Sequence, residues 1–310
     1  MPANLKDLRT RIRSVRNTEQ ITKAMKLVST AKFGRAQTTV FQAKPYARAL
    51  MRMVRDVVGS LGAGASHPLM EPSKSDVTHI IVVSSERGLC GSYNSNVTKL
   101  TLKMLAEEQE AGRKVAITCL GKKAHQSLIR NAAIKGFVNK QCALTDLESA
   151  PDQFGDQGVI RLVATPFEKR VKPFSEALSH LIINSFGKNF GKLIFVFTRF
   201  ESAGNLPLVA ETVLPFDKNA LSGEKPGEAT FEPSAQEVLD VALPRYLATA
   251  VYQTLLEAVA SEHCARMAAM DSATRNAKEM LRKLQVTYQR ARQAAITKEL
   301  IEIVSGAEAL

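Results

Sequence analysis

The feature that most restricts the fold is a long carboxyl-terminal stretch without helix breakers. From Arg245 to Ser305 the chain contains neither glycine nor proline. Such a stretch favours one continuous helix, which at ~1.5 Å per residue would reach roughly 90 Å. Helices of globular proteins average ~10–14 residues, and no small globular domain could cover one of this length. We therefore expect this helix to pair with another helix.

An apolar repeat predicts which face of this helix meets its partner. Spacings of 4, 3, 4, 3 and 4 residues separate Ala277, Leu281, Leu284, Tyr288, Ala291 and Ala295. This rhythm is typical of a coiled-coil seam, and the alanines would permit close approach of the two helices. Ile296, Leu300 and Ile303 then move the apolar positions to another face of the helix.

The amino-terminal segment carries a matching repeat. Spacings of 3, 4 and 3 separate Leu5, Leu8, Ile12 and Val15. After a polar break at 17–20, Ile21, Met25 and Val28 resume the rhythm, which predicts a phase slip in the seam. Both termini are therefore expected to form one long antiparallel two-helix coiled coil.

Proline and glycine residues predict where the amino-terminal helix ends. Pro45 is expected to kink or divide it. Gly59, Gly62 and Gly64 are expected to end it. We assign residues 1–58 and 239–310 to the coiled coil.

The middle of the chain, residues 59–238, alternates between apolar runs and amphipathic stretches. Strands are predicted at 77–84, 114–120 and 193–198, with an edge strand at 206–214, and helices at 94–111, 122–130 and 175–186. This alternation is typical of a Rossmann-like open α/β domain with a mostly parallel sheet. Residues 217–235 are expected to form a polar loop.

Net charge indicates an acidic partner. The formal charge is +12, and residues 1–58 hold 13 Lys and Arg against three acids. Such a segment favours nucleic acid, anionic lipid or an acidic protein surface, although a solvated helix face is the ordinary alternative. Hydrophobic residues make up 45% of the chain, but no apolar run approaches the ~18 residues of a membrane span.

The sequence carries none of the common catalytic or metal-binding patterns. The chain has no GxxxxGK[ST] phosphate loop, no HExxH group, and four cysteines spaced too widely for a zinc module. The turn at 87–91 (RGLCG) follows a strand and precedes a helix, yet it lacks the GxGxxG pattern. We therefore expect no cofactor, no metal and no catalytic activity of the chain alone.

Four segments carry a family resemblance. They are residues 21–28 (ITKAMKLV), 84–91 (SSERGLCG), 261–270 (SEHCARMAAM) and 296–309 (ITKELIEIVSGAEA). In this order they resemble the gamma subunit of F-type ATP synthases, and the resemblance runs from Leu5 to Leu310.

The resemblance implies a rotor. In that family the coiled coil stands inside three alpha and three beta subunits. The α/β domain sits, with the epsilon-type subunit (delta in mitochondrial naming), on the membrane ring of c subunits. Proton flow turns ring and shaft together, and the shaft drives the beta sites through different states for ATP synthesis or, in reverse, hydrolysis.

The same resemblance implies contact residues. Met25 and Lys26 would meet the alpha/beta head, and Glu232 would meet the c-ring. Further head contacts would be Arg292, Gln293, Thr297 and Glu299. Seam packing is an equally good reading of Met25, and ordinary solvated charge is an alternative for Glu232.

Two other functions remain open at this point. One is a basic coiled coil that binds nucleic acid, and the other is an α/β enzyme with a helical dimerisation arm. For a rotor, we expect the matrix face of the mitochondrial inner membrane, with the cytoplasmic face of a bacterial plasma membrane as the alternative. The chain would be peripheral to the membrane and bind no nucleic acid.

Overall fold

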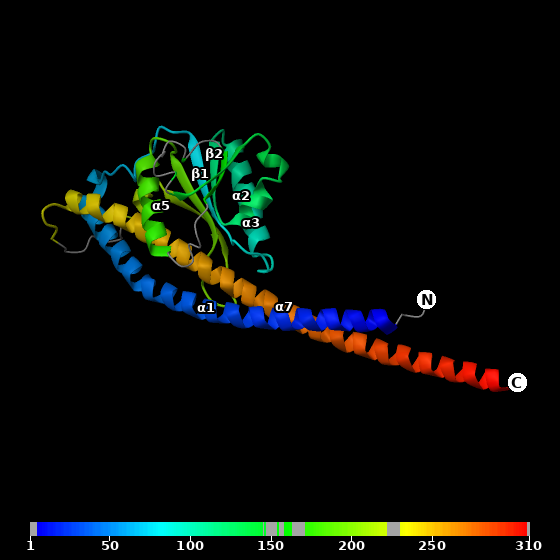
Figure 1. The fold of residues 1–310 in the computed structure, drawn as a ribbon. Coiled ribbons are helices and arrows are strands. Elements are labelled where there is room, and N and C mark those ends of the chain that lie inside the picture. Colours follow the sequence, from blue (N-terminus) through cyan, green and yellow to red (C-terminus); the bar gives the residue numbers. More distant parts are fainter. Residues whose placement is uncertain are drawn as a thin grey trace. The chain divides into compact units, whose positions relative to one another are not determined.

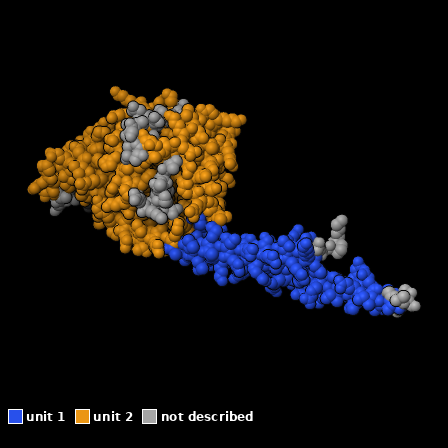
Figure 2. Space-filling view, in the orientation of Figure 1, with its two compact units in different colours: residues 1–31, 266–310 blue, residues 32–265 orange. Residues whose placement is uncertain are grey.

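The chain divides into two compact units, residues 1–31 with 266–310 and residues 32–265 (Figure 2). The computed structural model describes residues 5–144, 146, 154, 158–162, 171–221 and 230–308. Two long helices, α1 (Leu5–Leu61) and α7 (Ala235–Glu308), contribute to both units. The predicted domain boundaries at 58/59 and 238/239 stay predictions.

Both long helices are continuous. The prediction of an unbroken carboxyl-terminal helix is confirmed, and α7 begins ten residues earlier than the glycine- and proline-free stretch, with Pro244 inside it. Pro45 also lies inside α1, so of the two outcomes expected for it, a kink or a division, the division is wrong. A proline removes one helical hydrogen bond, but burial of neighbouring side chains such as Leu50 and Val54 stabilises the helix around it. Of the three glycines expected to end the helix, Gly59 lies inside α1, whereas the end before Gly62 is confirmed, because α1 stops at Leu61 and passes into the short 3₁₀ helix η1 (Gly62–Gly64).

Residues 32–265 contain a six-stranded sheet. Its strands are β1 (Val77–Val83), β2 (Lys114–Leu120), β3 (Val138–Cys142), β4 (Gly158–Leu162), β5 (Lys192–Thr198) and β6 (Leu208–Leu214). Their order is β3-β4-β2-β1-β5-β6, and every pair is parallel except β5 with β6. The predicted open, mostly parallel sheet and its edge strand β6 are confirmed. β3 and β4 were not predicted from the sequence.

Helices cover both faces of the sheet (Figure 1). The longer ones are α2 (Tyr93–Glu110), α3 (Lys122–Leu128) and α5 (Val171–Ser185), and the short helices η2 (Ala132–Ile134) and α6 (Lys218–Leu221) follow in the connections. The chain moves from β1 to β2 through α2, and back from β4 to β5 through α5. Right-handed crossovers in opposite directions along a sheet lie on opposite faces, so α2 and α5 are on different sides. Of the predicted loop 217–235, α6 occupies the start, and residues 222–229 lie outside the described part.

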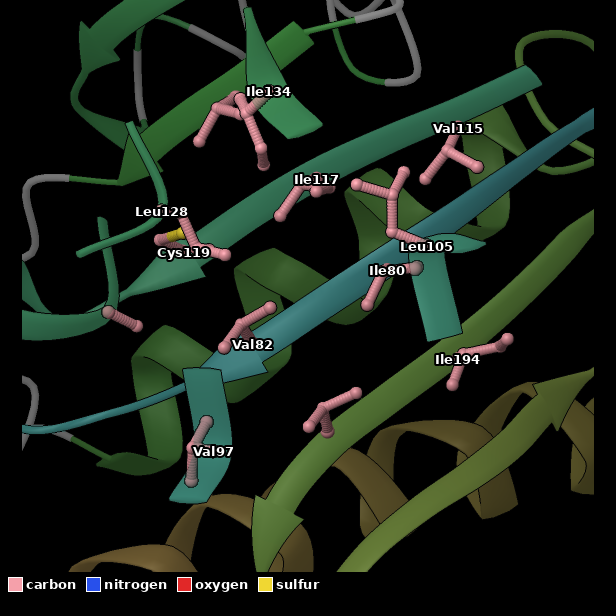
Figure 3. Packing of buried hydrophobic residues seen from close by; sticks show 13 residues of the cluster. Ile80, Val82, Val97, Leu105, Val115, Ile117, Cys119, Leu128, Ile134 and Ile194 are labelled. Atoms are coloured by element: carbon pink, nitrogen blue, oxygen red, sulfur yellow. The ribbon is translucent and has the colours of Figure 1, made fainter. Parts of the chain in front are cut away.

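The main core lies between the sheet and helices α2 and α3. Ile80 and Val82 of β1 pack there with Ile117 of β2, and Val97 and Leu105 of α2 close the layer (Figure 3). Because side chains alternate along a strand, His79 faces the other side of the sheet. Its ring centroid lies 4.3 Å from that of Phe154 and 5.1 Å from that of Phe190. Burial lowers the pKa of His79 to about 3, so this histidine is neutral and structural.

An ionic cluster around the buried Glu108 carboxylate ties α2 to the start of the sheet. The Glu108 carboxylate accepts hydrogen bonds from Lys192 Nζ at 2.6 Å, from Thr78 Oγ1 at 2.7 Å and from Arg113 Nε. Burial alone would raise the pKa of Glu108, but the hydrogen bonds from Arg113, Lys192 and Thr78 outweigh it and hold the pKa at about 2. The carboxylate is therefore charged at neutral pH.

Candidate functional site

Residues 5–31 and 266–308 form an antiparallel pair of helices. Thr22 Oγ1 lies 2.9 Å from Thr274 Oγ1. Arg9 Nε donates a hydrogen bond of 2.8 Å to the hydroxyl of Tyr288. Residue numbers rise along one helix as they fall along the other, so the predicted antiparallel coiled coil is confirmed.

The α7 side of the seam follows the predicted repeat. Ala277 is buried. The later residues of the repeat are partly buried, namely Leu281, Leu284, Tyr288, Ala291 and Ala295. The residues directly before and after each of these five are exposed. Carrying the same rhythm towards the amino terminus gives Thr274 and Met270, which are also buried. Neither residue was predicted as part of the seam, although extending the repeat predicts both.

The predicted phase slip in α1 is wrong. The seam continues in register through Glu19, Thr22 and Ser29, of which Thr22 is 8% and Ser29 3% exposed. Ile21 and Val28, which were expected to resume the seam, are 60% and 59% exposed. Position on the helix therefore decides burial here, and small hydroxyl residues occupy the seam in place of the larger apolar ones.

Apolar side chains remain on the outside of this two-helix unit. In α1, the side chain of Leu27 is exposed, as are those of Ile21 and Val28. Near the end of α7 a second exposed group comprises Ile296, Leu300, Ile301, Ile303 and Val304. The register that pairs residue 22 with 274 would place Leu5 opposite about residue 291, so this second group lies beyond the described start of α1. Exposed apolar clusters of this kind mark interaction sites.

An ion pair crosses the seam beside the buried threonines. Lys26 Nζ lies 2.6 Å from Asp271 Oδ1, and Arg275 Nη2 lies 3.4 Å from the other carboxylate oxygen. The hydrogen bond from Lys26 is the main reason that the pKa of Asp271 lies below its ordinary value. Lys26 thus has a partner within the unit while its side chain is still 41% exposed.

The predicted contact residues fall into separate places. Met25 is partly buried beside Lys26. The residues near the end of α7 are all exposed: Arg292, Gln293, Thr297 and Glu299. Arg292 follows Asp271 by 21 residues, which corresponds to roughly 30 Å along the helix at ~1.5 Å per residue. The two groups therefore do not form one compact site.

Glu232 belongs to the other unit and is exposed. A shallow hollow of about 600 Å³ lies next to it, lined in part by Tyr46, Met53 and Val241. These three apolar side chains are themselves 60%, 40% and 56% exposed. Their exposure gives this end of residues 32–265 a second surface able to meet a partner.

The glycine turn at 84–91 is held by its own hydrogen bonds. Ser85 N donates to Asn94 Oδ1 at 3.1 Å, and Ser85 Oγ donates to Arg87 O at 2.6 Å. Asn94 Nδ2 lies 3.1 Å from Cys90 Sγ, and Cys90 is buried. These contacts fix the turn as part of the fold and leave the Cys90 thiol inaccessible.

The described residues include neither a metal-ligand cluster nor a membrane-spanning helix. They contain no group of three or more His, Cys, Asp or Glu placed to hold a metal ion. Among them, no helix combines the length and apolar character needed to cross a bilayer.

Comparison with known proteins assigns the family. A family model described as ATP synthase matches residues 4–310. The ATP synthase gamma chain of Rhodospirillum rubrum is 38% identical over 322 residues, covering 99% of this chain and 100% of that one. The chain belongs to the ATP synthase gamma family. The gamma chain of Chlorobium phaeobacteroides is similar as well, at 36% identity over 99% of this chain and 98% of the relative.

Solved structures share the fold. One chain of the Euglena gracilis mitochondrial ATP synthase, from a structure of OSCP, F1 and c-ring, superposes with a TM-score of 0.60 at 19% identity. The match covers 98% of this gamma-family chain and 94% of the Euglena chain. A chain of the Euglena rotor structure gives a TM-score of 0.57 at 18% identity, over 94% and 98% of the two chains.

Proposed function

We propose that this chain is the central-stalk subunit of a proton-driven F-type ATP synthase. It transmits rotation of a membrane c-ring to three catalytic beta subunits, for synthesis or hydrolysis of ATP. The observation that carries the proposal is the match to gamma chains over 99% of this sequence. Partners are three alpha and three beta subunits, an epsilon-type subunit and the c-ring.

The head would contact the two-helix unit. Its exposed apolar groups offer area to neighbouring subunits, and the basic side chains of residues 1–58 offer attraction to acidic loops. Met25 and Lys26 would contact the head at one height along the shaft. The other predicted head contacts would lie at a different height: Arg292, Gln293, Thr297 and Glu299. Diffuse charge suits a shaft that turns past three equivalent partners, because a buried ion pair costs several kcal/mol to break at each step.

Residues 59–238 would form the foot on the c-ring, with 1–58 and 239–310 as the shaft. Glu232 would take part in the foot contact. The apolar hollow beside it supports this assignment.

The subunit itself would be non-catalytic, with the chemistry in the beta subunits. The subunit would lie on the side of the membrane where the head of alpha and beta subunits is located. The bacterial relatives, at 36% and 38% identity, favour the cytoplasmic face of a bacterial plasma membrane over the matrix face of the mitochondrial inner membrane.

Subunit stoichiometry is the first test. The tagged chain would be purified from detergent-solubilised membranes and examined by native mass spectrometry together with an ATPase assay. One copy with three alpha and three beta subunits and ATP hydrolysis is the expected result. Recovery of the chain alone, as a self-dimer or with nucleic acid would refute the proposal.

A cross-link then tests rotation. A photoreactive phenylalanine analogue replacing Leu300 should link to the head on illumination and stop ATP hydrolysis. The same analogue at Val138, exposed on β3, is the matched control, since a link at the foot joins parts that turn together. Hydrolysis that continues at full rate after complete linking at Leu300 would contradict a turning shaft.

A further inference from the structure

A basic cavity of about 790 Å³ lies within residues 32–265. Its walls come from α1, from α7 and from the edge formed by β5 and β6. Five cationic side chains line it, namely Lys44, Arg48, Arg52, Arg55 and Arg199. Among the described residues, only two carboxylates, those of Glu211 and Glu257, line it with them.

Both carboxylates already have partners in the cavity wall. Glu211 pairs with Arg199. Glu257 lies 3.9 Å from Lys44 Nζ and 3.8 Å from Arg199 Nε, and its Oε1 accepts a hydrogen bond of 3.2 Å from Gln253. The two acids are therefore engaged with Lys44 and Arg199, and they leave the remaining cations uncompensated.

Three arginines on one helix face make up that uncompensated charge. Arg48, Arg52 and Arg55 follow at intervals of four and three residues, so they share a face of α1 and extend over roughly 10 Å. Within the part of the chain that the structure describes, no carboxylate lies within ion-pair distance of any of the three. Several positive charges on one concave surface repel each other, so binding of an anion there lowers the electrostatic free energy.

The side chains also suit phosphoryl groups in detail. Each guanidinium presents a planar fork of donors that can bind two phosphate oxygens at once. Tyr246 lies in the same wall, and burial raises the pKa of its hydroxyl, so the O–H remains a donor at neutral pH. The volume falls in the ~300–1,000 Å³ range of small-molecule sites.

We propose that this cavity binds a small anion with two or more phosphoryl groups, such as pyrophosphate or a nucleoside triphosphate, across Arg48, Arg52 and Arg55. A single phosphate would span only part of the arginine row and bind more weakly. The inference stands independently of the proposed rotor function, because it rests on the cavity alone.

Calorimetric titration of the full-length chain with pyrophosphate tests the inference at about 0.1 M salt, where distant charges are screened. The chain is used without other subunits, so that no other nucleotide site contributes heat. Saturable binding at one site per chain is expected, with orthophosphate at least about tenfold weaker. ATP should compete with pyrophosphate.

Matched variants locate the site. Arg52→Gln should lower the affinity about tenfold, whereas Arg35→Gln, the same change at an exposed position of α1 outside the cavity, should leave it unchanged. Glu211→Gln removes one of the two acidic partners of Arg199 and should raise the affinity about threefold. Circular dichroism confirms that each variant is folded.

Three results would overturn the inference. They are no saturable binding to the folded chain, equal losses in Arg52→Gln and Arg35→Gln, or tighter binding of poly-glutamate than of pyrophosphate. The last would identify an acidic protein segment as the occupant.

Discussion

The buried carboxylate of Glu108 should control the stability of the sheet in a pH-dependent manner. Its pKa falls from an ordinary 4.5 to about 2 in the folded chain. At 1.36 kcal/mol per pKa unit, the charged carboxylate contributes about 3 kcal/mol to folding at neutral pH. Because the folded-state pKa is the lower one, this contribution is complete above pH 4.5 and is lost as the pH falls towards 2.

Glu108→Gln removes this contribution. Hydrogen exchange measured by mass spectrometry on peptides from β1 and β2 should show protection about 300-fold lower than in the wild type at pH 7. At pH 3, well below the ordinary pKa of 4.5, the carboxylate is mostly protonated in the unfolded chain and contributes only about 1.4 kcal/mol to folding, so the difference should shrink to about tenfold. Glu110→Gln, an exposed change at the end of the same helix, is the control. A difference that is equal at pH 3 and pH 7 would refute the electrostatic reasoning.

Three further changes test local features. Gly121→Ala should lower the free energy of unfolding by about 3 kcal/mol in urea denaturation, because Gly121 has φ +112° and a Cβ there would lie 2.2 Å from a backbone oxygen. Gly34→Ala is the control: among the described residues no atom lies close to its added Cβ in the helix, so it should be neutral or stabilising. Replacing Thr22 and Thr274 together by valine should stabilise the two-helix unit by about 1 kcal/mol in thermal melts followed by circular dichroism, while either change alone should not. Cys142 should react first with a thiol reagent and faster as the pH rises, since it is the only cysteine of the four that is not fully buried and its burial raises the thiol pKa.

Continuous patterns were predictable from the sequence. Strands such as β1 and β2 are apolar runs buried on both faces, and α7 is marked by a lack of helix breakers. β3 is exposed at four of its five positions, so it carries no apolar run to find. β4 is short and contains Arg161, whose guanidinium pairs with Glu86 at 3.1 Å, a contact that spacing along the chain does not indicate. Strands that depend on such long-range contacts cannot be predicted from short sequence patterns.

The seam between residues 19 and 29 was misjudged for a different physical reason. Hydrophobicity alone favoured Ile21 and Val28 as seam residues, yet the helical register buries Thr22 and Ser29 instead. Thr22 is tolerated there because Thr274 offers a partner across the seam. The burial of Thr22 and Ser29 is predicted only when one uninterrupted seam register is applied to both helices together.

The same region links the structure to the proposed function. Burying a Leu, Ile or Val side chain is worth about 1.5–3 kcal/mol, so a coiled coil selected only for its own stability would place such residues in the seam. Here the seam carries small hydroxyl residues while Ile21, Leu27 and Val28 face outward. Those outward side chains lower the free energy only when another surface covers them. A shaft enclosed by other subunits meets that condition, and an isolated pair of helices does not.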